Sequence, residues 1–474
     1  MTAGRAAGRL VPPLRPTLVG AALVSAAIVT LGAPLVPAVG DHFQVPQERA
    51  QWSYTVTLLV GATVTPVLGR LADGHRRRIA MILTCVAVAA GCVLSALARG
   101  YGVFLAGRAV QGLAVSLVAM TIAVARDHVP GRPGVRLVAL LSITTALGAG
   151  VSYPLTTVVA QQFGLSAAYG LSAVLALLVT VAVMVGLPRT VDRGRPRGLD
   201  VPGAVLLAGG TAAALLVISQ GNSWGWSSRR LLALAAASGV LLAGWVAVEL
   251  RVRRPLVQLR LLVVRTVLIA DLTALLMGVS LYSVPVLVSR MAQAPVGTGY
   301  GAGISLGLVG LLMTPIAAGN LVGARLAAAA DDRFGPRAAL GIGALVAGLG
   351  PALLLAGVTG VWGLLVAIGL SAVGAGATFG SMPNLIVASV GPAETGSATS
   401  VNILLRAVGG ALGSAVTAAL LGAHPGAVPG FASDTGVRLA CLACAVTCLL
   451  AVAASAAMPA RAPAPGPVVP APVA

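Results

Sequence analysis

The chain has 474 residues, of which 58% are hydrophobic and only 9% are charged, and its mean hydropathy is +0.97. Repeated apolar runs of about 20 residues are typical of membrane-spanning helices, so this composition excludes a soluble globular enzyme. The formal net charge of +19 does not indicate a nucleic-acid partner, because all 31 basic residues are arginines spread through short segments between the apolar runs.

The apolar runs predict an all-α polytopic membrane protein with about 14 transmembrane helices, because a helix satisfies its own backbone hydrogen bonds in lipid. They divide the chain into a cytoplasmic tail (1–16), an N-terminal six-helix half (17–187), basic linkers with two extra transmembrane helices (188–265), a C-terminal six-helix half (266–458) and a disordered cytoplasmic tail (459–474). The predicted spans, in chain order, are 17–39, 54–68, 79–98, 102–124, 137–161, 167–187, 201–220, 231–249, 266–288, 301–323, 338–356, 361–390, 397–421 and 437–458.

The arginines predict how these spans are oriented, because an excess of basic residues in short loops marks the cytoplasmic side of a membrane protein. The tails and loops of one side hold 23 arginines and those of the other side hold six, while Arg108 and Arg406 lie within spans. We therefore expect a multi-pass protein of the cell membrane with both termini in the cytoplasm. The use of arginine without lysine is typical of GC-rich bacterial coding.

An arginine-rich loop after the second span recurs in part in the second half of the chain. The first copy, residues 69–78, reads GRLADGHRRR, and the second, residues 328–337, reads AAADDRFGPR. Asp73 thus corresponds to Asp332, and Arg78 to Arg337. Matched loops in two six-helix groups indicate duplicated transporter halves. The alternative for the arginines is that they only set the orientation of the helices.

The chain resembles the major facilitator superfamily, and in particular its fourteen-span drug:proton antiporter group. The matching residues are Gly69, Leu71, Ala72, Asp73, Arg77 and Arg78 in the loop, Leu105, Arg108, Gln111 and Gly112 in span 4, and Arg406, Gly409, Gly410 and Gly413 in span 13. Span 5 keeps Pro154 but has Tyr153 before it, where the antiporter pattern has glycine. The resemblance implies a conformational gate at Gly69, Asp73, Arg77 and Arg78, with Asp332 and Arg337 as its counterpart, and proton coupling at Arg108.

Charged side chains within the spans are candidates for proton coupling or for the substrate pathway, because charges are costly in lipid. Arg108 needs a cavity or a partner unless it snorkels to the interface, and Gln111, one turn on, could share its face. Asp271 is the only carboxylate well inside a span. Since desolvation favours its protonated form, its protonation could be coupled to conformation. An ion pair with Arg265 or Arg325 and simple exposure at the interface are the alternatives for Asp271.

Further polar residues within spans could line the substrate pathway or could simply bond neighbouring helices. These candidates are Tyr153, Pro154, Asn320, Asn384 and Asn402. The family pattern favours a structural or gating role for Arg406.

The sequence contains no phosphate-binding glycine loop and no His/Cys/carboxylate cluster, so neither ATP nor a metal is expected. We expect a transporter rather than an enzyme, with no cofactor and the proton gradient as its energy source. The expected partners are a small-molecule substrate and the lipid bilayer, with no nucleic acid and no obligatory protein partner. The expected function is proton-coupled efflux of amphipathic drugs or small metabolites by alternating access. The alternatives are uptake, transport of a single metabolite, and a receptor that transports nothing.

Overall fold

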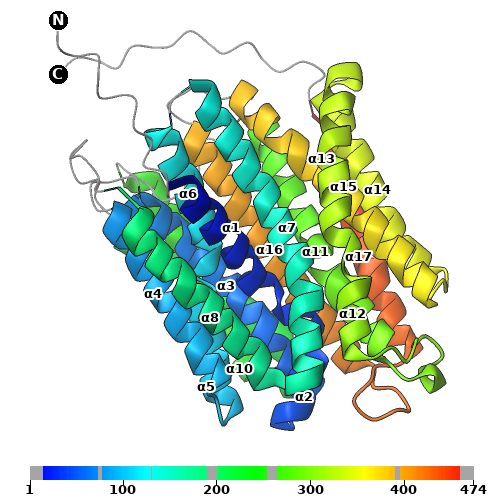
Figure 1. Ribbon diagram of the computed structural model, residues 1–474. Coiled ribbons are helices and arrows are strands. Elements are labelled where there is room, and N and C mark those ends of the chain that lie inside the picture. Colours follow the sequence, from blue (N-terminus) through cyan, green and yellow to red (C-terminus); the bar gives the residue numbers. More distant parts are fainter. Residues whose placement is uncertain are drawn as a thin grey trace, which may run out of the picture.

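The computed structural model describes residues 14–72, 77–129, 131–188, 200–252, 264–389 and 395–458. Within these residues every long element is an α-helix, and the β-contact found among them is an isolated bridge between Pro425 and Ala432. The helices run roughly side by side in one bundle (Figure 1). Eleven helical spans among the described residues are long and apolar enough to cross a membrane, or twelve if one bent pair counts as a single span. This confirms an all-α polytopic membrane protein, while the total of about 14 spans and the domain boundaries stay predictions.

In chain order the α-helices are α1 (Leu14–Thr30), α2 (Gly32–Phe43), α3 (Gln47–Ala72), α4 (Arg77–Ala96), α5 (Tyr101–Gln111), α6 (Ala114–His128), α7 (Gly131–Phe163), α8 (Leu165–Gly186), α9 (Val201–Trp224), α10 (Arg229–Arg251), α11 (Arg265–Gln293), α12 (Leu306–Leu312), α13 (Pro315–Phe334), α14 (Pro336–Leu355), α15 (Val361–Ser389), α16 (Thr395–Ala423) and α17 (Asp434–Ala456).

Three predicted spans differ from the helices observed. The span predicted at 102–124 consists of α5 and α6, which are interrupted at Gly112 and Leu113. The span predicted at 17–39 is the bent pair α1–α2, whose axes meet at 45°. Pro34 lies in the first turn of α2, where its missing N–H breaks no helical bond. The span predicted at 301–323 begins only at Leu306, because Gly299 (φ +82°) and Gly303 (φ +63°) hold the preceding segment in left-handed conformations. Its helices α12 and α13 then continue to Phe334.

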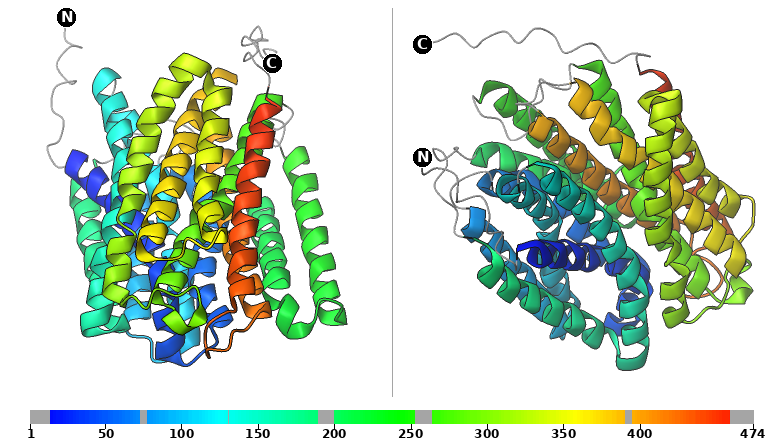
Figure 2. Two further views of the ribbon diagram at one scale, coloured as in Figure 1. Left: turned by 90° about the vertical axis from the view of Figure 1, so that its right-hand side faces the viewer. Right: turned by 45° about the horizontal axis from the view of Figure 1, so that its top comes forward.

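The helices pack as two groups with an added pair. Helices α1–α8 pack on one another, for example α4 on α8 and α1 on α7, and α11–α17 do so through α13–α15 and α11–α16. We call these the first and second helix groups. The groups meet mainly through α3 with α16 and α7 with α12. Helices α9 and α10 pack on each other at the margin of the bundle, and α9 touches both α3 and α16 (Figure 2, left, green).

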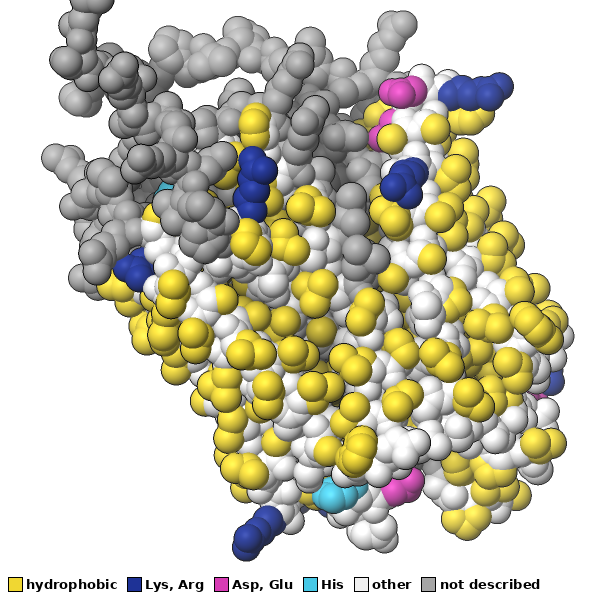
Figure 3. All heavy atoms as spheres, viewed as in Figure 1, with side chains coloured by type: hydrophobic (Ala, Val, Ile, Leu, Met, Phe, Trp, Pro, Cys, Tyr) yellow, Lys and Arg dark blue, Asp and Glu magenta, His cyan; other side chains and the backbone are white. Residues whose placement is uncertain are grey.

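The flanks of the bundle are apolar. Large hydrophobic side chains are exposed along them, including Leu97, Val185 and Val240. The face drawn in Figure 3 is mainly hydrophobic, and the charged side chains coloured on it lie towards its margins. An apolar surface of this extent is unfavourable in water and matches the hydrocarbon core of a bilayer.

Glycines hold α11 and α16 in close contact. A Cβ atom at Gly409 would stand 2.0 Å from the carbonyl oxygen of Leu275, and one at Gly278 would stand 2.3 Å from the carbonyl oxygen of Arg406. Only hydrogen atoms fit in these positions. Small residues of this kind let two helix backbones approach each other within a membrane. The glycine pattern of predicted span 13 therefore lies in a packing contact between helices.

We expect Gly409→Val to destabilise the protein by about 1–3 kcal/mol, because its side chain would force α16 away from the backbone of α11. Thermal unfolding of the purified protein would measure the effect as a lower melting temperature. Gly170→Ala on α8 is the matched control, since nothing lies within 4 Å of its added Cβ, and it should unfold at or above the wild-type temperature. Equal melting temperatures for Gly409→Val and wild type would contradict the packing role.

Candidate functional site

Arg108, on α5, is completely buried, with an exposed fraction of 0%. Its Nε donates to the backbone oxygen of Ser53 at 3.0 Å, and its Nη1 donates to the backbone oxygen of Ile28 at 3.4 Å and to the side-chain oxygen of Gln111. The guanidinium carbon lies 5.5 Å from the centre of the Tyr169 ring. Its Nη2 has no hydrogen-bond partner among the described residues. Arg108 thus does not snorkel to the surface, and it leaves one donor available inside the bundle.

Neighbouring helices fix the position of Arg108. The side-chain nitrogen of Gln111 donates to the backbone oxygen of Gly91 at 3.1 Å and to Oγ of Ser95 at 2.9 Å, so Gln111 ties α5 to α4. A Cβ atom at Gly32 would stand 2.5 Å from Nη2 of Arg108. The start of α2 therefore makes room for the guanidinium, and a longer side chain there would displace it.

Asp271, on α11, is also buried, with an exposed fraction of 1%. Its Oδ1 accepts a hydrogen bond of 3.0 Å from Nδ2 of Asn402 on α16, and that nitrogen also donates to the backbone oxygen of Ala270 at 3.2 Å. Within the part of the chain that the structure describes, the Oδ2 atom has no hydrogen-bond partner. Neither Arg265 nor Arg325 forms an ion pair with Asp271 among the described residues. The structure thus joins two predicted site residues, Asp271 and Asn402, which are 131 positions apart.

The other predicted pathway residues are dispersed. Arg406 is half-buried, and its guanidinium carbon lies 4.9 Å from the centre of the Phe379 ring. The side-chain nitrogen of Asn320 donates to the backbone oxygen of Ile316 in its own helix. Pro154 is half-buried within α7. Among the described residues, no hydrogen bond therefore joins Arg406, Asn320 or Pro154 to the Asp271 carboxylate.

The predicted gate is described only in part. Asp73 lies outside the described residues, as do the surroundings of Gly69 and the side chain of the pathway candidate Asn384. Nη1 of Arg77 donates to the backbone oxygen of Ala123 at 3.4 Å, while Asp332 is exposed. The gating role of the loop stays a prediction.

Arg78 and Arg337 nevertheless occupy equivalent places in the two helix groups. Arg78, in the first turn of α4, donates to the backbone oxygen of Met184 near the end of α8 at 2.8 Å. Arg337, in the first turn of α14, donates to the backbone oxygen of Ala456 at the end of α17. The last carbonyls of a helix lack intrahelical partners, so an arginine stabilises them. These two contacts repeat the same local arrangement in both halves.

Neutral polar groups join the two helix groups at the end opposite to Asp271. We call this the outer end, following the predicted orientation. Nε2 of Gln51 donates to Oγ of Ser414 at 2.8 Å, and the hydroxyls of Thr55 and Ser414 lie 2.6 Å apart. Oγ of Ser289 donates to the backbone oxygen of Pro34 at 3.3 Å. We call these contacts the outer closure. The sequence does not reveal these contacts, because uncharged Ser, Thr and Gln give no hydropathy signal comparable to that of a charge.

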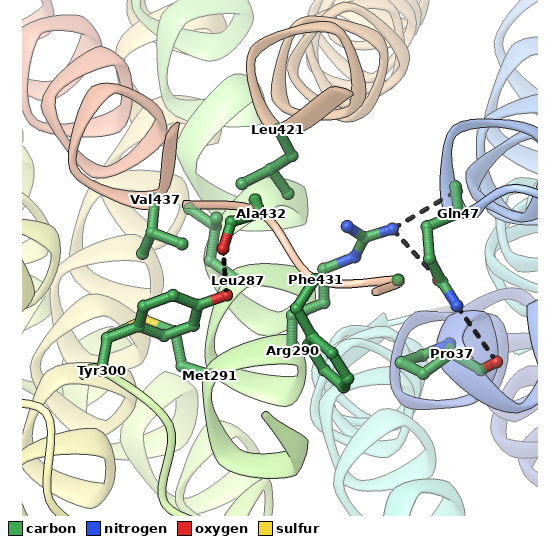
Figure 4. Close-up of a pocket in the computed structure, with 11 residues that line it drawn as sticks. Pro37, Gln47, Leu287, Arg290, Met291, Tyr300, Leu421, Phe431, Ala432 and Val437 are labelled. Carbon is green, nitrogen blue, oxygen red and sulfur yellow. Dashed lines mark hydrogen bonds between the residues drawn. The ribbon is translucent and has the colours of Figure 1, made fainter. Parts of the chain in front are cut away.

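A pocket beside the outer closure is lined by both helix groups (Figure 4). Nη2 of Arg290 on α11 donates to the backbone oxygen and to Oε1 of Gln47 on α3, at 3.3 and 3.2 Å. Nε2 of Gln47 donates to the backbone oxygen of Pro37 at 3.4 Å. Oη of Tyr300 donates to the backbone oxygen of Ala432 at 2.8 Å. The Arg290–Gln47 bonds join the first and second groups at the outer end, while the other two bonds each lie within one group.

Comparison with known proteins shows extensive similarity to membrane transporters. The pattern of the Major Facilitator Superfamily matches residues 18–302 and 272–473. The chain is 30% identical over 266 residues to the lincomycin resistance protein of Streptomyces lincolnensis. This match covers 55% of this chain and 54% of that protein. It is 27% identical over 423 residues to the tetracenomycin C resistance and export protein of Streptomyces glaucescens, covering 85% of this chain and 74% of that protein. The crystal structure of the peptide transporter POT in complex with sulfate matches with a TM-score of 0.67 at 15% identity, covering 93% of this chain and 94% of that one.

Proposed function

Because the chain belongs to the major facilitator superfamily, a family of membrane transporters, we propose that it is a proton-coupled exporter of amphipathic small molecules. Relatives named as antibiotic resistance and export proteins support the direction of transport. The placement within the fourteen-span drug:proton antiporter group is part of this proposal. The energy source is the proton gradient, and no cofactor or obligatory protein partner is required.

The observation that carries the proposal is the buried carboxylate of Asp271, whose Oδ2 accepts no hydrogen bond from any described residue. An ionised carboxylate without a cation is strongly disfavoured in a membrane interior, and a bound proton removes that cost. Of the two carboxylate oxygens, Asn402 donates to Oδ1, so it holds the side chain in place and leaves Oδ2 open to a proton. Asp271 is therefore the proton carrier that we propose.

The depth of Asp271 supports inward proton flow. It lies six residues after Arg265, at which α11 begins, or about 9 Å along the helix axis. A proton on Asp271 has a short path to the predicted cytoplasmic side. The outer closure separates it from the other side of the membrane. Export then requires the two helix groups to separate at the outer end, which breaks the Gln51–Ser414 and Thr55–Ser414 contacts.

Transport by inverted membrane vesicles tests the proposal. Vesicles that contain the protein should accumulate an amphipathic fluorescent dye when a proton gradient is imposed, and an uncoupler should abolish that accumulation. Vesicles without the protein are the control. Accumulation only in right-side-out vesicles would show uptake instead, and accumulation unaffected by the uncoupler would contradict proton coupling.

A further inference from the structure

Arg406 on α16 places a positive charge at mid-depth in the bundle. It lies eleven residues, or about 17 Å, beyond Thr395, at which the 29-residue helix α16 begins. Its guanidinium carbon lies 4.9 Å from the centre of the Phe379 ring on α15. Among the described residues it forms no hydrogen bond and no ion pair, and its side chain is half-buried. The five donors of this guanidinium are therefore available to a ligand.

The packing of α16 turns Arg406 towards the interior of the second helix group. A Cβ atom at Gly278 on α11 would stand 2.3 Å from the carbonyl oxygen of Arg406, so this turn of α16 lies against α11. Phe379 packs on two buried apolar clusters of the same group, which include Met277 and Met382. Arg406 thus lies over an aromatic ring that belongs to the protein core, between three helices, as expected of a charge that avoids lipid.

A buried carboxylate lies one helix turn away from Arg406. Asn402 precedes Arg406 by four residues on α16, and side chains at this spacing share one face of a helix, with Cβ atoms about 5–6 Å apart. Nδ2 of Asn402 donates to Oδ1 of Asp271 at 3.0 Å. Oδ2 of Asp271 accepts no hydrogen bond from any described residue. Asn402 therefore connects two charged groups of opposite sign.

These two charges do not neutralise each other in this structure. No ion pair joins Arg406 to Asp271 within the part of the chain that the structure describes. A charge without a partner is costly in a membrane interior, and this cost applies at both positions. A molecule that brings an anion to Arg406 and a cation to Asp271 removes both costs and adds no net charge. A cation alone is repelled by Arg406, and an anion alone is repelled by an ionised Asp271.

We propose that Arg406, Phe379 and Asp271 bind the transported molecule, and that this molecule is an aromatic zwitterion. Its carboxylate binds Arg406, its ammonium group binds Oδ2 of Asp271, and its ring packs beside Phe379. This substrate class rests on the proposed function as an exporter. An ammonium group and a proton cannot occupy Oδ2 together, so substrate binding releases the proton of Asp271 to water. Mutual exclusion of this kind is what the exchange of substrate for protons requires.

Calorimetric titration of the purified full-length protein in lipid nanodiscs tests the substrate class without a proton gradient. The three probes share a biphenyl scaffold. The first carries an aminomethyl group at one end and a carboxylate at the other, the second carries only the aminomethyl group, and the third carries only the carboxylate. We expect the zwitterion to bind at least about 10-fold more tightly than either other probe, because each charged contact contributes a strong hydrogen bond. Empty nanodiscs are the blank.

Two variants assign the charged groups of the probe to their partners. Arg406→Gln should bind the zwitterion and the amine with equal affinity, because the carboxylate of the zwitterion has lost its cation. Asp271→Asn should bind the zwitterion and the acid with equal affinity, for the corresponding reason. Arg333→Gln is the matched control, since the guanidinium carbon of Arg333 lies 5.4 Å from the Phe334 ring centre at an exposed position. It should keep the full preference for the zwitterion.

Equal affinity of the wild type for the three probes would overturn the inference, as would an undiminished preference for the zwitterion in both Arg406→Gln and Asp271→Asn. If either variant fails to fold, the order of the three probes on the wild type still decides. A zwitterion that binds as expected but is not exported by a proton gradient would refute the export proposal alone. Proton-driven dye export by a protein with no preference for the zwitterion would refute this inference alone.

Discussion

Asp271→Asn should lower proton-driven dye accumulation at least about 10-fold, the largest functional effect that we expect from a conservative substitution. Asparagine keeps the size of the side chain and an oxygen that can accept from Nδ2 of Asn402, but it cannot bind and release a proton. Downhill exchange of substrate across the membrane should therefore continue. Reconstituted vesicles, measured with and without a proton gradient over a range of external pH, would separate the two activities.

Asp434→Asn is the matched control for Asp271→Asn. Asp434 lies at the outer end of α17, where its carboxylate pairs with Arg438 at 2.7 Å and both side chains are about half exposed. Exposed ion pairs contribute little, so this variant should transport as the wild type does. Wild-type accumulation and pH dependence in Asp271→Asn would rule out Asp271 as the proton carrier.

Arg108→Ala should both abolish transport and destabilise the protein, by about 2–4 kcal/mol. Its loss removes a donor from the side-chain oxygen of Gln111 and from the backbone oxygens of Ser53 and Ile28 in the bundle interior, of which that of Ser53 still accepts from Oγ1 of Thr57. Each buried acceptor that loses its donor costs about 1–3 kcal/mol, partly offset because a buried charge is removed. Thermal unfolding and dye accumulation would measure the two effects.

Arg99→Ala is the control for Arg108→Ala, because it removes the same side chain at an exposed position in the turn before α5. It should unfold and transport like the wild type. Arg108→Lys keeps the charge but cannot reproduce three directed donors, so its melting temperature should fall between those of Arg108→Ala and wild type. An unchanged melting temperature in Arg108→Ala would contradict the hydrogen bonds that place Arg108 at the centre of the site.

Hydropathy identified most helices correctly, but it did not find their interruptions. The bend between α1 and α2 and the late start of α12 depend on backbone conformations at a few residues, whose neighbours are as apolar as those in continuous helices. By contrast, Arg108 and Asp271 could be identified from the sequence, because a charge within an apolar run is conspicuous.

The sequence by itself determined that this is a helical membrane protein, which family it resembles, and which buried charges need an explanation. Transfer into a membrane is a property of each residue and its near neighbours, so a local pattern is sufficient for these conclusions. Only the tertiary structure decided which groups meet. Asp271 finds Asn402 131 positions away, and Gln51 finds Ser414 363 positions away. Such partners depend on how helices pack, and close approach through residues such as Gly278 and Gly409 has no signature in hydropathy.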